Sequence, residues 1–159
     1  MTRVKPILIL LVLLCISLFG QTFTARVVCV IDGDTVSVLT ARTELRIRLA
    51  ECDAPESSQP FGYRAKQFAS SLVFGRDGGI LVQGTDRYYR TIAHVTTDQG
   101  LDLSTELIRA GFAWWYRQYS PNSELGFVEA EPRAAKRGLW ADDSASPPWE
   151  WAPQALTAG

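Results

Sequence analysis

The chain has 159 residues, enough for one domain and too few for two separate hydrophobic cores. Hydrophobic residues make up 47% of it and charged residues 21%, a balance that excludes an intrinsically disordered protein. The formal net charge of −1 excludes a broadly basic protein that coats nucleic acid by charge alone. One His and three Cys supply too few ligands for a His/Cys zinc centre.

The first twenty residues have the features of an export signal. Arg3 and Lys5 precede an apolar run over residues 7–19, which is shorter than the roughly 20 residues of a membrane span. We therefore expect residues 1–20 to direct the chain to a periplasmic or secreted location. An uncleaved membrane anchor is the alternative.

Five segments of the remaining chain are rich in Val or alternate in hydropathy. They are predicted to be strands over residues 25–31, 36–39, 45–49, 80–83 and 91–96. Apolar residues at helical spacing predict a helix over residues 63–74, which Gly75 would end.

Two further helices are expected near the C-terminus. Asp102 or Ser104 can cap a short helix that ends at Gly111, and Ser120 can open a last helix that Pro132 should kink or interrupt. The order of elements indicates an α+β protein, and a five-stranded OB-fold β-barrel with about three helices fits it.

The domain is expected to span residues 21–145. The Pro- and Trp-rich tail, residues 146–159, should be extended and dock its tryptophans on the domain. Cys29 and Cys52 remain after removal of the signal, and they can either form a disulfide or stay as two thiols.

Four carboxylates follow the ends of two predicted strands, and they belong to Asp32, Asp34, Asp53 and Glu56. Converging carboxylates repel one another unless a cation lies among them. Oxygen ligands without a thiolate or an imidazole favour calcium or magnesium. The alternative is ordinary turn chemistry, because Asp-Gly-Asp is common in turns.

Arginines lie close to these carboxylates in the sequence. Arg46 and Arg48 share one face of a predicted strand, and Arg87 and Arg90 precede the last one. Guanidinium groups beside a cation suit a phosphodiester, whose oxygens gain charge during cleavage. A lattice of salt bridges on the barrel surface is the alternative.

An aromatic cluster follows the short helix. Tyr116 and Tyr119 are the candidates for stacking on nucleobases, whereas Trp114 and Trp115 can equally pack the last helix and the tail onto the barrel. His94 lies in the middle of a predicted strand and is expected to be structural.

Several motifs together resemble the staphylococcal-nuclease-like family, also called thermonucleases. They are V-I-D-G-D-T-V from Val30, R-L-A-E-C-D-A-P-E from Arg48, Q-P-F-G, D-R-Y-x-R from Asp86, A-G-F-A and R-G-L-W. The resemblance extends from about residue 28 to residue 140. It implies an OB-fold barrel with three helices and calcium-dependent cleavage of DNA and RNA.

The resemblance also implies roles for the acidic residues. Asp34 and Asp53 match carboxylate ligands of calcium, with the backbone carbonyl of Ala54 as a further ligand. Asp32 matches an acid that holds metal-bound water. Glu56 matches the residue that orients or deprotonates the attacking water.

The basic residues match in the same way. Arg48 and Arg90 match the pair that binds the scissile phosphate, and Arg87 and Tyr88 match positions that contact a neighbouring phosphate. One departure is Tyr89, which stands where the family usually has Gly. Because Tyr is poorly suited to positive φ, the turn that presents Arg90 is expected to differ from that of the family.

These observations predict a calcium-dependent phosphodiesterase that hydrolyses DNA and RNA with low sequence specificity and leaves 3′-phosphate ends. A catalytically weak or inactive OB-fold module that binds nucleic acid or peptide is the alternative. We expect a monomer, infer no protein partner, and expect membrane association only if the signal is uncleaved.

Overall fold

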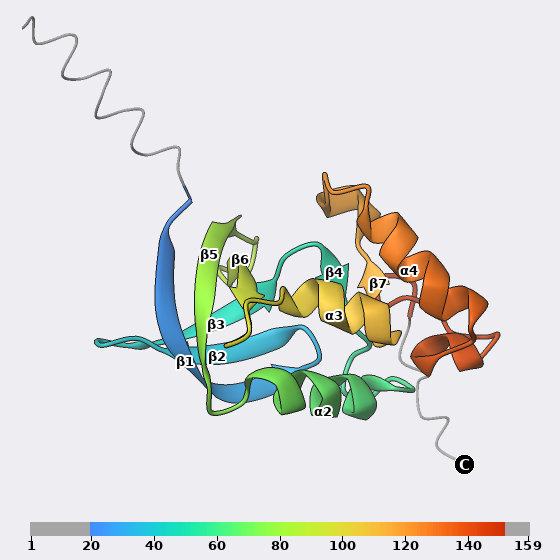
Figure 1. Ribbon diagram of the computed structural model, residues 1–159, viewed down its shortest axis with the longest axis horizontal. Helices are drawn as coiled ribbons and strands as arrows, with labels where there is room; N and C mark the ends of the chain where they lie inside the picture. Colours follow the sequence, from blue (N-terminus) through green and yellow to red (C-terminus); the bar gives the residue numbers. More distant parts are fainter. Residues whose placement is uncertain (1–19, 152–159) are drawn as a thin grey trace, which may run out of the picture.

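The computed structural model describes residues 20–151, and the predicted export signal therefore lies almost wholly outside the described residues. Five strands form a closed barrel (Figure 1). They are β1 (Thr22–Asp32), β2 (Thr35–Leu39), β3 (Glu44–Leu49), β5 (Asp77–Thr85) and β6 (Thr91–Thr96).

The barrel closes in the order β1-β2-β3-β6-β5, and β1 pairs with β5. The pairs are antiparallel except β3 with β6, which run parallel. Alternate strand residues point inward and are fully buried, as expected for a strand with one face on the core. They include Val27, Val36, Val38, Ile47, Ile80 and Val95.

Three α-helices lie outside the barrel, namely α2 (Gly62–Val73), α3 (Leu103–Ala110) and α4 (Leu125–Ala134). The buried face of α2 carries Ala65, Ala69 and Val73, small residues that let the helix approach the barrel. Figure 1 shows α2 along one side of the barrel and α3 between the barrel and α4. The predicted α+β class and OB-type barrel are thus confirmed.

A two-stranded ribbon joins the barrel to the helical part of the domain. In it β4 (Cys52–Asp53) pairs antiparallel with β7 (Trp114–Trp115), so that Asp53 lies opposite Trp114. The 3₁₀ helix η1 (Arg117–Tyr119) follows β7, and a second one, η2 (Gly138–Ala141), follows α4.

The capping prediction for α3 is confirmed and the predicted start of the last helix is wrong. Asp102 accepts a hydrogen bond from the N–H of Thr105 at 2.8 Å, and α3 gives way to Gly111 in a left-handed conformation. The last helix, α4, begins at Leu125 because the hydroxyl of Ser120 instead donates to Glu51 at 3.1 Å. The helix passes through Pro132 and ends two residues beyond it.

Both cysteines in the described part of the chain are free thiols. Cys29 is exposed on β1, whereas Cys52 is buried, and this burial raises the pKa of its thiol. The structure therefore supports the second of the two alternatives. Among residues 20–151, no helix has the length and apolar character needed to cross a membrane.

Candidate active site

Asp34 is fixed in the tight turn between β1 and β2. A Cβ atom on Gly33 would come within 2.8 Å of the Cβ atoms of both Ala54 and Ala65, so glycine allows this turn to pack against its neighbours. The Asp34 carboxylate is buried, and it accepts hydrogen bonds from the N–H of Ala54 at 2.6 Å and the hydroxyl of Thr35 at 3.1 Å.

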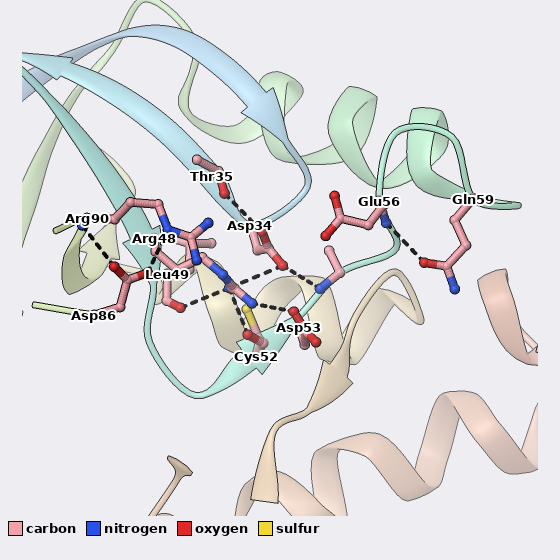
Figure 2. A network of polar contacts seen from close by, with 11 residues as sticks. Asp34, Thr35, Arg48, Leu49, Cys52, Asp53, Glu56, Gln59, Asp86 and Arg90 are labelled. Carbon is pink, nitrogen blue, oxygen red and sulfur yellow. Dashed lines mark hydrogen bonds and ion pairs between the residues drawn. The ribbon is translucent and has the colours of Figure 1, made fainter. Parts of the chain in front are cut away.

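Arg48 joins the two carboxylates predicted to bind metal. It lies on β3, directly opposite Thr35, so the strand register brings its side chain to Asp34. Its Nη1 atom lies 3.1 Å from Oδ2 of Asp34, and its Nη2 atom donates to Oδ1 of Asp53. Figure 2 shows this guanidinium between the two carboxylates. Nη1 also donates to the carbonyl of Cys52 at 3.0 Å, which fixes the side chain further.

The cluster has more negative charge than Arg48 can balance. Burial and the nearby carboxylates of Asp34 and Glu56 raise the pKa of Asp53 to about 7, although Arg48 opposes this shift. Burial and the charges of Asp34 and Asp32 also raise the pKa of Glu56. Burial alone would lower the pKa of Arg48, but the surrounding carboxylates raise it above its usual range.

Glu56 lies beside the cluster without joining its ion pairs. Its backbone N–H donates to the side chain of Gln59 at 3.1 Å, which fixes the loop before α2. Figure 2 shows its carboxylate directed toward Asp34. Within residues 20–151 this carboxylate forms no ion pair, so it is free to accept a proton or a hydrogen bond from a ligand.

Arg90 is held by Asp86 in the turn between β5 and β6. The Asp86 carboxylate accepts hydrogen bonds from Nε of Arg90 at 2.6 Å and from the backbone N–H groups of Tyr88 and Arg90 at 2.8 and 2.9 Å. Tyr89 nevertheless adopts a φ of 60°, so this turn has a left-handed residue without glycine. Arg87 and Arg90 both lie over the ring of Tyr88, 4.8 and 5.7 Å from its centroid.

The side chains of Asp32 and Arg46, two further residues singled out in the sequence, form no hydrogen bond or ion pair with Asp34, Arg48 or Asp53. Asp32 accepts a hydrogen bond from the hydroxyl of Ser57, which ties the end of β1 to the loop after Glu56. Arg46 is exposed, so of the two arginines predicted on one strand face only Arg48 enters the cluster.

The aromatic candidates divide into buried and exposed positions. Trp114 is buried against Trp140, whereas Tyr119 is 65% exposed. The ring of Tyr116 is stacked on Trp149 of the tail, with ring centroids 5.1 Å apart and planes 3° apart. The predicted docking of a tail tryptophan is confirmed, and it occupies one face of a residue predicted to contact bases.

In the described part of the chain, no group of three or more His, Cys, Asp or Glu side chains is arranged to hold a metal ion. The donor set nevertheless fits a hard divalent cation. Asp34 and Asp53 converge on a single guanidinium, and the adjacent Cys52 thiol stays protonated because it is buried. Carboxylate and carbonyl oxygens are the ligands that calcium prefers.

The sequence did not indicate the specific contacts of two residues that shape the site. Asp86 holds Arg90, and the signal that could have identified it is its place at the start of the D-R-Y-x-R turn, where Asp often accepts backbone hydrogen bonds. Trp149 covers Tyr116, and no local pattern indicates this long-range stack.

The fold and this cluster define an OB-type barrel protein with an acidic and basic site beside its strand ends. The sequence profile of the family described as staphylococcal nuclease homologue matches residues 46–142. The chain is 39% identical over 138 residues to an uncharacterized endonuclease of Escherichia coli, which covers 87% of each chain. It is 37% identical over 139 residues to micrococcal nuclease of Shigella flexneri, which covers 81% of this chain and 80% of the relative. The chain belongs to the staphylococcal nuclease family.

Proposed function

We propose that this protein is an exported, calcium-dependent nuclease that hydrolyses DNA and RNA with little sequence preference and leaves 3′-phosphate ends. Membership of the family, together with relatives named endonuclease and micrococcal nuclease, supports nuclease activity. The observation that supports the finer proposal is the position of Arg48, which contacts both Asp34 and Asp53. Beside it lies the carboxylate of Glu56, which forms no ion pair in the part of the chain that the structure describes.

Asp34, Asp53 and the backbone carbonyl of Ala54 would hold the calcium ion. When bound, calcium would supply Lewis-acid stabilisation of the charge that develops on a phosphate oxygen. A site with few protein charges binds calcium weakly, which suits a location outside the cytoplasm where calcium is more abundant.

Glu56 would act as the general base, since its carboxylate lies at the cluster and forms no ion pair with any residue in the range 20–151. Water attacks the phosphorus while Glu56 takes its proton, and the bond from phosphorus to the 5′ oxygen breaks. The products are a 3′-phosphate and a 5′-hydroxyl, whose oxygen takes up a proton. Arg48 and Arg90 would donate hydrogen bonds to the phosphate oxygens as negative charge accumulates on them.

Residues around this centre would bind the rest of the substrate. Arg87 and Tyr88 lie in the same turn as Arg90 and would contact a neighbouring phosphate. The exposed ring of Tyr119 and the edge of Tyr116 would contact bases. Contacts to phosphates and ring faces do not depend on base identity, so sequence preference should be low.

The test is hydrolysis of single-stranded DNA with calcium and then with excess chelator, followed by analysis of the ends. We expect 3′-phosphate ends and activity that the chelator abolishes. Asp34→Ala, Asp53→Ala and Arg90→Ala should each lower the rate at least about 100-fold while the fold remains. Arg76→Ala, which removes an exposed arginine paired with Asp98, is the matched control and should stay active.

Near-full activity of Asp34→Ala, or cleavage unaffected by the chelator, would contradict the metal assignment. A folded wild-type protein that binds single-stranded DNA without cleaving it at any calcium concentration would instead establish a nucleic-acid-binding module.

A further inference from the structure

A cavity of about 480 Å³ lies between β7, α4 and the tail, outside the cluster of carboxylates and arginines. Its aromatic lining comes from Trp114, Trp115, Tyr116 and Trp149. This volume is within the range of sites that bind small organic molecules and is sufficient for a nucleobase with its sugar.

The tail builds one wall of this cavity. Trp149 stacks in parallel on Tyr116 and meets Trp114 edge-on, with ring centroids 6.5 Å apart. Trp149 keeps 47% of its surface exposed despite these two contacts. Its ring is therefore fixed in orientation and still accessible, which is the condition for a stacking platform.

The charges in the cavity wall cancel. The lining includes two basic residues, Arg117 and Arg133, and two acidic ones, Glu129 and Glu150. The buried Glu129 carboxylate accepts a hydrogen bond from Arg117 at 2.8 Å. Without a net positive charge the cavity has little attraction for a phosphate, whereas aromatic walls suit an uncharged, flat ligand.

The cavity is also connected to the candidate active site through the β4–β7 ribbon. Trp114 lies opposite Asp53 in this ribbon. The N–H of Tyr116, the first residue after β7, donates to the carbonyl of Glu51 at 2.9 Å.

We infer that this cavity binds one nucleobase of the nucleic-acid substrate, from a nucleotide near the one whose phosphate is cleaved, and that Trp149 is the ring on which this base stacks. The inference depends on the proposed function, because the base is part of the same substrate strand. It adds a contact made by the tail, beyond the residues that hold the phosphate.

The experiment measures binding of thymidine pentanucleotides to the Glu56→Gln protein, which should not cleave them. Five versions each lack one base, replaced by an abasic sugar. At one position, loss of the base should weaken binding roughly 5- to 100-fold, which is the contribution expected from one base stacked on an aromatic side chain. In Glu56→Gln combined with Trp149→Ala, loss of that same base should change the affinity less than twofold.

Phe127→Ala is the matched control, because it removes an aromatic ring that is 81% exposed on α4 and does not line the cavity. With Phe127→Ala, removal of the base should weaken binding as much as it does without this substitution. Trp149→Phe keeps an aromatic ring, so removal of the base should still cause most of the loss in affinity. Circular dichroism establishes that each variant is folded.

The inference is overturned if no position combines a loss on base removal with suppression of that loss by Trp149→Ala. If the wild-type protein nevertheless cleaves long single-stranded DNA, the proposed nuclease function stands and only the base site fails. If the wild-type protein neither binds nor cleaves nucleic acid, both proposals fail together.

Discussion

Oδ2 of Asp34 lies 3.1 Å from the guanidinium of Arg48, and the strand register produces this contact, because the residue after Asp34 is paired directly with Arg48. The carboxylate is therefore fixed before any ligand arrives. A divalent cation that shares Asp34 with Arg48 would complete the charge balance of the cluster.

Calcium should stabilise the folded protein. A ligand that binds only the folded state at about ten times its Kd adds about 1.4 kcal/mol to the free energy of unfolding, which raises the Tm by about 4 °C for a domain of this size. Thermal unfolding with and without calcium measures this effect. Asp34→Ala and Asp53→Ala should remove it and Asp98→Ala should not; an equal rise of Tm in Asp34→Ala would refute this metal site.

Tyr89→Gly should make the protein more stable. The φ of 60° at Tyr89 is strained for a residue with a Cβ atom, and the side chain is 91% exposed, so little packing is lost. After subtraction of the chain entropy that glycine costs, a gain of about 0.5–1 kcal/mol is expected in chemical denaturation. Tyr88→Gly is the control: Tyr88 lies in the same turn but does not have positive φ, so this substitution should not stabilise the protein. A destabilised Tyr89→Gly protein would contradict the strain argument.

Asp86→Asn should impair catalysis through Arg90. The amide oxygen can still accept the backbone hydrogen bonds of the turn, but the charged contact to Nε of Arg90 is lost. A loosely placed guanidinium should lower kcat roughly 10- to 100-fold with a smaller change in KM. Steady-state kinetics together with Tm separate this positioning role from a structural one, since unfolding should be little affected. A variant with unchanged kcat would show that Arg90 needs no such support.

Stability should depend on pH through His94. Its Nδ1 lies 3.0 Å from Asp102, with Glu51 3.9 Å from Nε2, and the hydrogen bond with Asp102 raises the pKa of His94 above 6.5. A raised pKa means that the stabilisation is present below about pH 6.5 and is lost as the pH rises through the folded-state pKa. Despite partial burial, the contacts with His94 keep the pKa of Asp102 below 3.8, so its contribution persists down to acidic pH.

His94→Gln should therefore lower the free energy of unfolding by about 1 kcal/mol more at about pH 5.5 than at about pH 8.5. Urea denaturation at the two pH values measures the difference. A variant that removes the exposed Arg76–Asp98 pair should show no such dependence. An equal loss for His94→Gln at both pH values would mean that the histidine is not charged in the folded protein.

The sequence predicts most elements of the fold where hydropathy alone decides them. The strand Thr91–Thr96 matches its prediction, and Asp102 caps the helix as expected. By contrast, β5 extends well beyond residues 80–83 because pairing with β1 and β6 recruits glycines and polar residues that carry no strand pattern. The hydroxyl of Ser120 could not be assigned, since its partner, Glu51, is distant in the sequence.

For the candidate site, the sequence likewise predicts which charged residues meet but not the contacts that support them. The carboxylates and arginines are grouped in short motifs at strand ends, so Asp34, Arg48 and Asp53 could be expected to meet, and the structure brings them into contact. The support of Arg90 by Asp86 and the cover of Tyr116 by Trp149 depend on tertiary geometry, which spacing does not encode.

The candidate site draws its side chains from three separate segments, around residues 34, 48–56 and 86–90, and the β4–β7 ribbon adds a fourth near residue 115. Parallel pairing of β3 with β6 also requires the chain to be made past residue 90 before the barrel can close. An unfinished or unfolded chain consequently has no assembled centre. If the chain is exported unfolded, in line with the proposal above, the nucleic acids of the producing cell are not exposed to an assembled centre before folding is complete.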